Sequence, residues 1–190
     1  MSGEFPPVAA LPQLTLHPSV NPEEIKPAEI VSDWLKSFVE GLEKGDISGN
    51  FLDKESWCRD FISFSWDIAC HNGAEAISNY LIASKVEFSD PKPDQLGVLQ
   101  PQLADLGGLR FIQSGFSFKT KFGTGKGVLR LASVGPDQWK AWTVFTVLEK
   151  LDEKADLGSS KTEAKEQSSA LNHGVDDPQV LIVGAGNSHT

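Results

Sequence analysis

Cysteine is scarce in this 190-residue chain, which has only Cys58 and Cys70. They sit at the two ends of one predicted strand, and an extended strand would hold them far apart. We therefore expect two free thiols rather than a disulfide. Their spacing matches neither a zinc nor a redox motif. The chain also lacks a His-Glu-x-x-His run and a nucleophile elbow. Metal sites and acyl-transfer chemistry are therefore not predicted.

Long apolar runs are also absent, because no stretch approaches the length that crosses a bilayer. The first 22 residues contain no Lys or Arg, and prolines interrupt their apolar residues. This pattern argues against a secretory or transit signal, so we interpret residues 1–20 as a flexible lead into a cytoplasmic protein without a membrane partner. A hydrophobic content of 39% predicts a globular core.

The net charge of −9 is unevenly distributed. Residues 1–109 carry 17 acids and 7 bases, residues 110–151 carry 2 acids and 7 bases, and residues 152–177 carry 7 acids and 3 bases. The bases of the middle block alternate with apolar residues at strand spacing. This alternation is typical of the solvated face of a sheet, so nucleic-acid binding is not predicted.

Two helices are expected in the first half of the chain. Residues 27–44 show apolar positions at helical spacing, with a proline in the first turn and a glycine just after the end. A short helical turn is expected at 46–52. Residues 56–69 alternate and are rich in aromatics, which predicts one strand. A second amphipathic helix is predicted at 71–85, entered through an Asn-Gly turn.

The second half is predicted to form strands. Residues 86–108 are irregular or weakly strand-like, whereas residues 109–122, 128–134 and 139–151 have clear strand patterns. The glycine-rich stretch at 123–127 reads as a turn. Helices followed by a meander predict an α+β fold, with N-terminal helices packed on a curved antiparallel sheet. This domain should span residues 21–151.

Residues 152–177 differ abruptly, since they hold no aromatic residue and are dominated by Ser, Lys and Glu. We interpret them as a disordered linker. A short apolar strand follows within 178–190, and Gly184, Ala185 and Gly186 then open a turn of the dinucleotide-binding type. His189 occupies the place of the third glycine of that motif.

This order of elements resembles the nuclear transport factor 2-like (SnoaL-like) cone. The matching stretches are the helix at 27–44, "WCRDF" with "FSWD", "NGAEAISNYL", and the terminal strand "WKAWTVFTVLEKL". With the linker and "DDPQVLIVGAGNS" after it, the chain is similar to the N-terminal region of fungal flavin-containing monooxygenase-like proteins. Residues 178–190 would then be the truncated first strand and glycine turn of an FAD-binding domain.

The resemblance implies that a full-length relative uses FAD and NADPH to oxygenate a small organic substrate. Gly184 and Gly186 correspond to the first two glycines of the motif. The phosphate-binding helix and the acidic residue for the ribose are missing here. We therefore expect this chain to bind no cofactor and to be catalytically silent, with the cone serving assembly or shielding of the active site.

Two residues could give the cone its own chemistry. Asp60 lies among apolar neighbours on its strand face, where a carboxyl can serve as general acid or base. The alternative is a structural carboxylate that is satisfied by a nearby amide, arginine or tryptophan N–H. His71 is expected at the start of the second helix, facing the pocket mouth, or else as a cap or surface residue. A straight strand would separate the two residues.

Two other functions remain open. The cone could bind or turn over a small apolar ligand in its own pocket, with Asp60 as the reactive group. Alternatively, it could be a dimerisation module, because the last predicted strand is apolar on both faces. Trp139, Ala141, Phe145 and Val147 are predicted on one face, with Trp142, Val144 and Leu148 on the other. Helices would cover one face, and a second copy or the flavin domain would cover the other.

Overall fold

The structure is a computed structural model that describes residues 14–152. Predictions on residues 1–13 and 153–190 lie outside the described residues. They include the flexible lead before residue 14, the linker from residue 153 onward, the terminal strand, and the turn at Gly184, Ala185 and Gly186.

The helices agree closely with the sequence pattern. Helix α1 (Pro27–Lys44) begins with proline and ends at Gly45, which adopts a left-handed conformation with φ 75°. Two short 3₁₀ helices flank it, η1 (Pro22–Glu24) and η2 (Ser48–Asn50). Helix α2 (Ala74–Ser84) lies within the second predicted helix.

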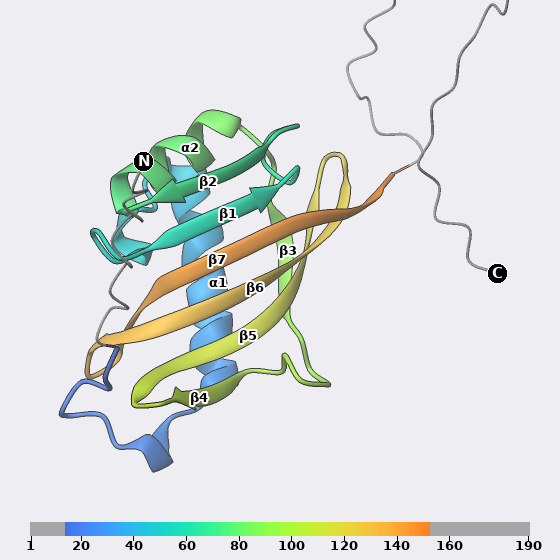
Figure 1. The fold of residues 1–190 in the computed structure, drawn as a ribbon. Coiled ribbons are helices and arrows are strands. Elements are labelled where there is room, and N and C mark those ends of the chain that lie inside the picture. The colour runs from blue at the N-terminus through green and yellow to red at the C-terminus, as the bar shows by residue number, and fades with distance from the viewer. Residues whose placement is uncertain (1–13, 153–190) are drawn as a thin grey trace, which may run out of the picture. The chain divides into compact units, whose positions relative to one another are not determined.

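Seven strands form one sheet with the order β2-β1-β7-β6-β5-β3, and β4 also pairs with β5. They are β1 (Trp57–Phe61), β2 (Ile68–Asn72), β3 (Ser89–Pro93), β4 (Gln102–Leu106), β5 (Leu109–Thr120), β6 (Gly123–Gly135) and β7 (Gln138–Leu151). Helix α1 crosses one face of this sheet, and α2 lies beside the β1–β2 end (Figure 1). The α+β fold class is thus confirmed.

The sheet is mixed rather than antiparallel throughout. Strand β1 pairs with β7 in parallel, with Trp57 opposite Thr143 and Phe61 opposite Val147. All other strand pairs are antiparallel. The prediction missed this pair because a parallel partner 86 residues away leaves no local turn signal in the sequence.

The single strand predicted at 56–69 is wrong, because this region is the hairpin of β1 and β2. The chain reverses after Phe61, at Ile62, which has a φ of 55°. The Asp60 carboxylate accepts hydrogen bonds from the backbone N–H groups of Ser63 and Phe64, which fixes the reversal. Aromatic residues continue through the loop, so composition alone suggested one continuous strand.

The predicted faces of the last strand also need correction. The pairing register between β6 and β7 shifts between Arg130 and Leu131, which inserts one extra residue into β7 near Trp142. As a result, Trp139 and Ala141 pack with the main core on the helix side. Trp142 instead packs in a second cluster with Phe111.

The predicted turn at 123–127 lies inside β6, and the actual turn between β5 and β6 is at Lys121 and Phe122. Glycine is needed at these positions because a side chain would collide with neighbouring rings, and not because the backbone turns there. A Cβ atom on Gly125 would collide with the Phe118 ring, and one on Gly127 would collide with the Phe116 ring. These glycines therefore let two phenyl rings lie across β6.

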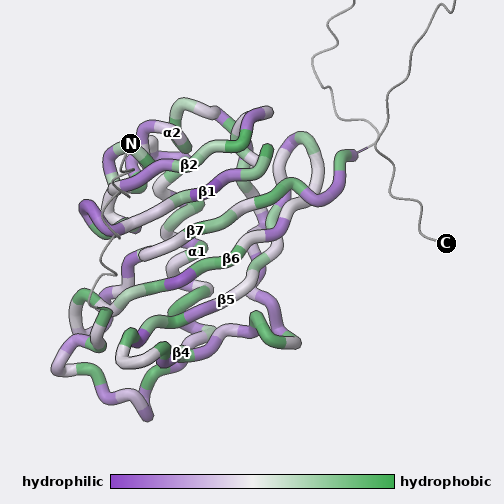
Figure 2. The backbone as a smooth tube through the Cα atoms, viewed as in Figure 1, coloured by the Kyte–Doolittle hydropathy of each residue, from purple (hydrophilic) through white to green (hydrophobic). Residues whose placement is uncertain are grey.

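The main core lies between the helices and the sheet, and hydrophobic positions recur along β5, β6 and β7 (Figure 2). A smaller cluster on the other side of the sheet consists of Leu14, Phe111 and Ala132, with Trp142 against it. The Leu14 carbonyl accepts a hydrogen bond from the Arg110 N–H, so the segment before α1 covers part of the outer sheet face. Neither α1 nor α2 is long and apolar enough to span a bilayer.

Candidate functional site

The predicted site residue Asp60 is completely buried. Its Oδ1 accepts hydrogen bonds from the Ser63 N–H at 3.0 Å and the Thr146 hydroxyl at 2.7 Å. Its Oδ2 accepts from the Phe64 N–H at 3.0 Å and the Tyr80 hydroxyl at 2.8 Å. Four donors thus surround one carboxylate, two on each oxygen.

Three separate elements supply these donors. The β1–β2 loop gives two backbone N–H groups, α2 gives Tyr80, and β7 gives Thr146. A buried carboxylate is tolerated when its lone pairs are hydrogen-bonded, and here the carboxylate joins hairpin, helix and sheet. The Asp60 carboxylate therefore has the hydrogen-bonded environment of a structural carboxylate, which was the alternative to a reactive group. The donors are hydroxyls and backbone amides rather than an arginine or an indole.

His71 lies on β2 rather than at the start of α2, and the hairpin brings it to the strand beside Asp60. Its backbone pairs with Cys58, so His71, Cys58 and Asp60 share the inner face. The imidazole stacks on the Tyr80 ring with centroids 4.2 Å apart. Tyr80 therefore lies between His71 and Asp60 and joins the two predicted residues indirectly.

The buried environment near Asp60 suppresses ionisation of the Tyr80 hydroxyl and the Cys58 thiol. Burial raises the pKa of Tyr80 well above its ordinary value, and its hydrogen bond to Asp60 and the Asp60 charge add to the increase. Burial likewise raises the pKa of the Cys58 thiol to about 12, with a further contribution from Asp60. Both groups are therefore neutral near pH 7, so the tyrosine can donate to the carboxylate but Cys58 is a poor nucleophile.

The two cysteines are free but are not held far apart along one strand. Cys58 pairs with His71, whereas Cys70 pairs with Arg59 on the neighbouring position. Cys58 points into the core and Cys70 is exposed on the opposite face of the sheet. The two thiols are separated because they lie on opposite faces of the β1–β2 hairpin, and not because they lie at opposite ends of one strand.

Phe64 fills the space next to Asp60. Only 3% of its surface is exposed, and its ring stacks on Phe88 at 5.8 Å between centroids. Phe88 stacks in turn on Phe118 at 4.7 Å and meets Phe38 edge-on. Aromatic rings thus occupy the interior that the cone resemblance would assign to a pocket.

A small hollow lies at the same end of the domain. It has a volume of about 150 Å³ and is lined by the β1–β2 loop, the end of α2 and the β5–β6 turn. Its walls include Ile62, Phe64 and Trp66 from the loop. Trp66 is half exposed and contacts Phe122 with ring centroids 4.9 Å apart. We call residues 62–67 the mouth loop.

Sequence reasoning missed Tyr80 and Thr146 as partners of Asp60. Tyr80 is the only tyrosine in the chain, and Thr146 is a polar residue within an apolar strand. Each is a weak signal for a buried hydrogen bond. Bringing both side chains to Asp60 requires the β1–β2 hairpin and the parallel β1–β7 pair, neither of which the sequence pattern indicated.

Within residues 14–152, no group of three His, Cys, Asp or Glu side chains is arranged to hold a metal ion.

No family model and no curated protein matches this chain. Solved structures do match, at low identity. They include a nuclear transport factor 2-like protein from Cytophaga hutchinsonii, with 8% identity over 66% of this chain and 100% of that one and a TM-score of 0.44. A putative aromatic ring hydroxylase from Novosphingobium aromaticivorans has 9% identity over 66% and 92%, with a TM-score of 0.41. A steroid delta-isomerase from Pseudomonas aeruginosa has 14% identity over 72% and 84%, with a TM-score of 0.38. The likeness concerns the fold alone, and no statement about activity rests on it.

Proposed function

We propose that the cone binds a small, planar, apolar ligand at its mouth, in the space that Phe64 occupies. The supporting observation is the position of this ring within the core. It belongs to a short loop, it stacks on Phe88 as a planar ligand would, and it borders the 150 Å³ hollow. A ligand that replaced the ring would gain the same stacking and apolar burial.

The mouth loop has features that favour opening. Ile62 has a φ of 55°, a conformation that costs a β-branched residue on the order of 1–3 kcal/mol. Two backbone hydrogen bonds to Asp60 hold the closed form. In the closed state the strain at Ile62 thus opposes the hydrogen bonds of the next two residues, and a ligand of modest affinity could shift the balance.

Opening would also give Asp60 a role toward the ligand. Movement of the loop removes the Ser63 and Phe64 N–H donors and leaves an acceptor position on each carboxylate oxygen, while Tyr80 remains as a donor. A ligand hydroxyl or an acidic C–H could then reach Asp60. General acid or base catalysis by Asp60, with His71 behind Tyr80, stays a prediction for this open form.

Truncation of Phe64 tests the proposal. We expect Phe64→Ala to bind indole at least tenfold more tightly than the natural chain in ligand-observed NMR, because the cost of opening is removed. Phe51→Ala is the matched control, since Phe51 is an equally buried phenylalanine in the Trp34–Phe38 cluster. Equal gains in both variants, or none in Phe64→Ala, would disprove the proposal. Phe64→Leu provides a milder truncation if the alanine variant unfolds.

Self-association is a second candidate function, favoured by the outer sheet face. An apolar strip there, interrupted by Arg59, comprises Trp57, Phe61, Ile68, Phe145 and Val147, and the exposed fractions of Trp57 and Ile68 are 49% and 68%. Such strips mark protein interfaces. We expect sedimentation at micromolar concentration to detect a dimer that Phe145→Lys disrupts. A monomer under these conditions would remove the support for a dimerisation module.

The flavin-monooxygenase hypothesis depends on residues 180–186, outside the described part of the chain. That a full-length relative uses FAD and NADPH, and that the outer face packs on its flavin domain, therefore remain predictions. We expect the purified 190-residue chain to carry no flavin, as judged by flavin absorbance and fluorescence. Bound flavin would contradict the view that the site is incomplete.

A further inference from the structure

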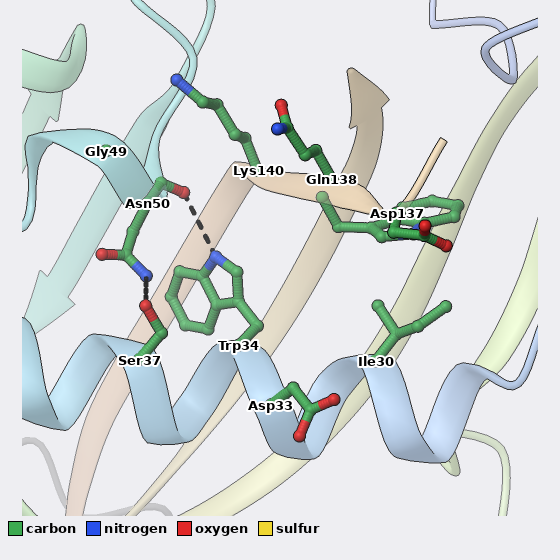
Figure 3. A pocket seen from close by; sticks show the side chains of 10 residues that line it. Ile30, Asp33, Trp34, Ser37, Gly49, Asn50, Asp137, Gln138 and Lys140 are labelled. Atoms are coloured by element: carbon green, nitrogen blue, oxygen red, sulfur yellow. Dashed lines mark hydrogen bonds between the residues drawn. The ribbon is translucent and has the colours of Figure 1, made fainter. Parts of the chain in front are cut away.

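Two adjoining cavities lie far from the mouth loop, between α1 and the turn that joins β6 to β7. Their volumes are about 460 Å³ and about 490 Å³, each within the range of small-molecule sites. Both are lined by Ile30 and Asp33 of α1 and by Asp137 and Trp139 of the turn and β7. Figure 3 shows the first of them.

The back wall of the first cavity is fixed by hydrogen bonds. The Trp34 indole N–H donates to the Asn50 carbonyl at 3.2 Å, and the Asn50 side-chain amide donates to the Ser37 hydroxyl at 3.1 Å (Figure 3). Trp34 has only 5% of its surface exposed, and Trp139 packs against the main core. A ligand would therefore meet a preformed wall of indole and Ile30, with little ordering cost.

The charges that line the two cavities are mostly negative. The acids are Glu24, Glu29, Asp33 and Asp137, and the bases are Lys26 and Lys140, so four acids outnumber two bases by two. Lys26 pairs with Glu29. No ion pair within residues 14–152 involves Asp33 or Asp137, the two carboxylates that both cavities share.

Asn50 adds a polar side chain to the lining of the first cavity. It lines the first cavity, and only 9% of its surface is exposed. Its side-chain oxygen Oδ1 accepts none of the hydrogen bonds formed within residues 14–152, although its amide nitrogen is used. Every buried side-chain nitrogen and oxygen within residues 14–152 has a hydrogen-bond partner, so the Asn50 Oδ1 is an accessible acceptor, which can take a hydrogen bond from a ligand N–H group.

We propose that these cavities form a binding site for a small organic monocation, an ammonium group attached to an apolar or aromatic body. The ammonium would lie near Asp33 and Asp137, and the apolar body would lie on Trp139 and Ile30. An aromatic face beside carboxylates is the usual environment for such ions. A divalent metal would instead need several oxygen ligands converging on one point, and within residues 14–152 no group of three His, Cys, Asp or Glu side chains is arranged to hold one. This site is separate from the mouth loop and does not depend on the function proposed there.

Calorimetric titration with phenethylammonium chloride tests this site, and 2-phenylethanol is the neutral probe of matching shape. We expect the ammonium to bind and the alcohol to bind at least tenfold more weakly. The double variant Asp33→Asn/Asp137→Asn should weaken ammonium binding by about five- to tenfold, the effect of two partly exposed ion pairs. The matched control is Glu43→Gln, which neutralises an acid at the other end of α1 and should leave binding unchanged.

Four results would overturn the proposal. Absence of ammonium binding, or equal binding of the alcohol, would show that no cation site exists. An equal loss in Glu43→Gln would trace the effect to the overall negative charge. Competition by calcium chloride at matched ionic strength would identify a metal site instead. Because both asparagine substitutions lie at exposed positions, the variants should remain folded, and their unfolding curves provide the check.

Discussion

We call Asp60 and its four hydrogen-bond donors the carboxylate clamp. Replacement of Asp60 by Asn tests this clamp most directly, because it removes the charge and preserves the shape of the side chain. An asparagine side chain offers one oxygen where the carboxylate offers two. Its NH₂ group must therefore face two of the four donors. The Thr146 and Tyr80 hydroxyls can rotate to accept from it, but the backbone N–H of Ser63 or Phe64 cannot.

Either orientation of the amide thus leaves one buried N–H without an acceptor. Such a group costs about 1–3 kcal/mol, and the remaining hydrogen bonds lose the strength given by a charged acceptor. The neutral amide is easier to bury, which offsets part of this loss. We expect Asp60→Asn to lower the free energy of unfolding by about 2–3 kcal/mol at pH 7.

Urea denaturation measures this change, with a constant slope as the check that both proteins unfold in the same way. Thr146→Val is the matched control, because it removes one hydroxyl donor and leaves both backbone donors paired; we expect a loss of about 1 kcal/mol. A loss below about 0.5 kcal/mol for Asp60→Asn would refute the clamp. If Asp60→Asn also left indole binding unchanged, Asp60 would have no role toward a ligand.

Three further substitutions probe other features of the fold. The pKa of Cys58 is raised from 9.0 to about 12 in the folded protein, so between these pH values the thiol ionises only in the unfolded chain. This difference should lower the free energy of unfolding by about 1.4 kcal/mol per pH unit. Cys58→Ala should remove this part of the alkaline loss of stability, as measured by urea denaturation at several pH values. Ile62→Gly should relieve the positive φ and raise the unfolding free energy by about 1 kcal/mol, whereas Ile68→Gly in an ordinary strand should lower it. Gly127→Ala should cost about 1–3 kcal/mol by displacing the Phe116 ring, while Gly49→Ala, which meets no atom within 4 Å, should be nearly neutral in thermal unfolding.

Each of these expectations has a contrary result. An unchanged alkaline slope in Cys58→Ala would mean that other groups, Tyr80 first among them, account for the pH dependence. Equal losses in the two Ile→Gly variants would mean that the mouth loop stores no backbone strain. A neutral Gly127→Ala would show that the ring can move without cost.

Local signals in the sequence were sufficient for the helices and the long strands. Pro27 and Gly45 mark the ends of α1 because a proline lacks a donor that the first turn does not need, and a glycine accepts the left-handed ending. The strands β5 and β7 were found from their apolar and aromatic residues, which are bounded by turn signals. The α+β class follows from these elements, since helices precede a meander.

Long-range pairing could not be read from local patterns. The β1–β2 reversal depends on a side chain that bonds to the backbone three and four residues later, at a loop that is as aromatic as the strands. The face of Trp139 depends on a register shift in β7. Asp60 was recognised from its apolar neighbours, but its partners Tyr80 and Thr146 come from elements 20 and 86 residues away.

The parallel pairing of β1 with β7 has a consequence for the order of folding. Residues 57–61 cannot complete their place in the sheet until residues 143–147 exist. During synthesis, the first hairpin, which ends at Asn72, must therefore wait until residues 73–147 have also been made. Contacts of such long sequence separation are slow to close, because the loop entropy is lost before the contact forms. We infer that docking of β1, together with burial of Asp60 against Thr146, is a late step that completes the native domain.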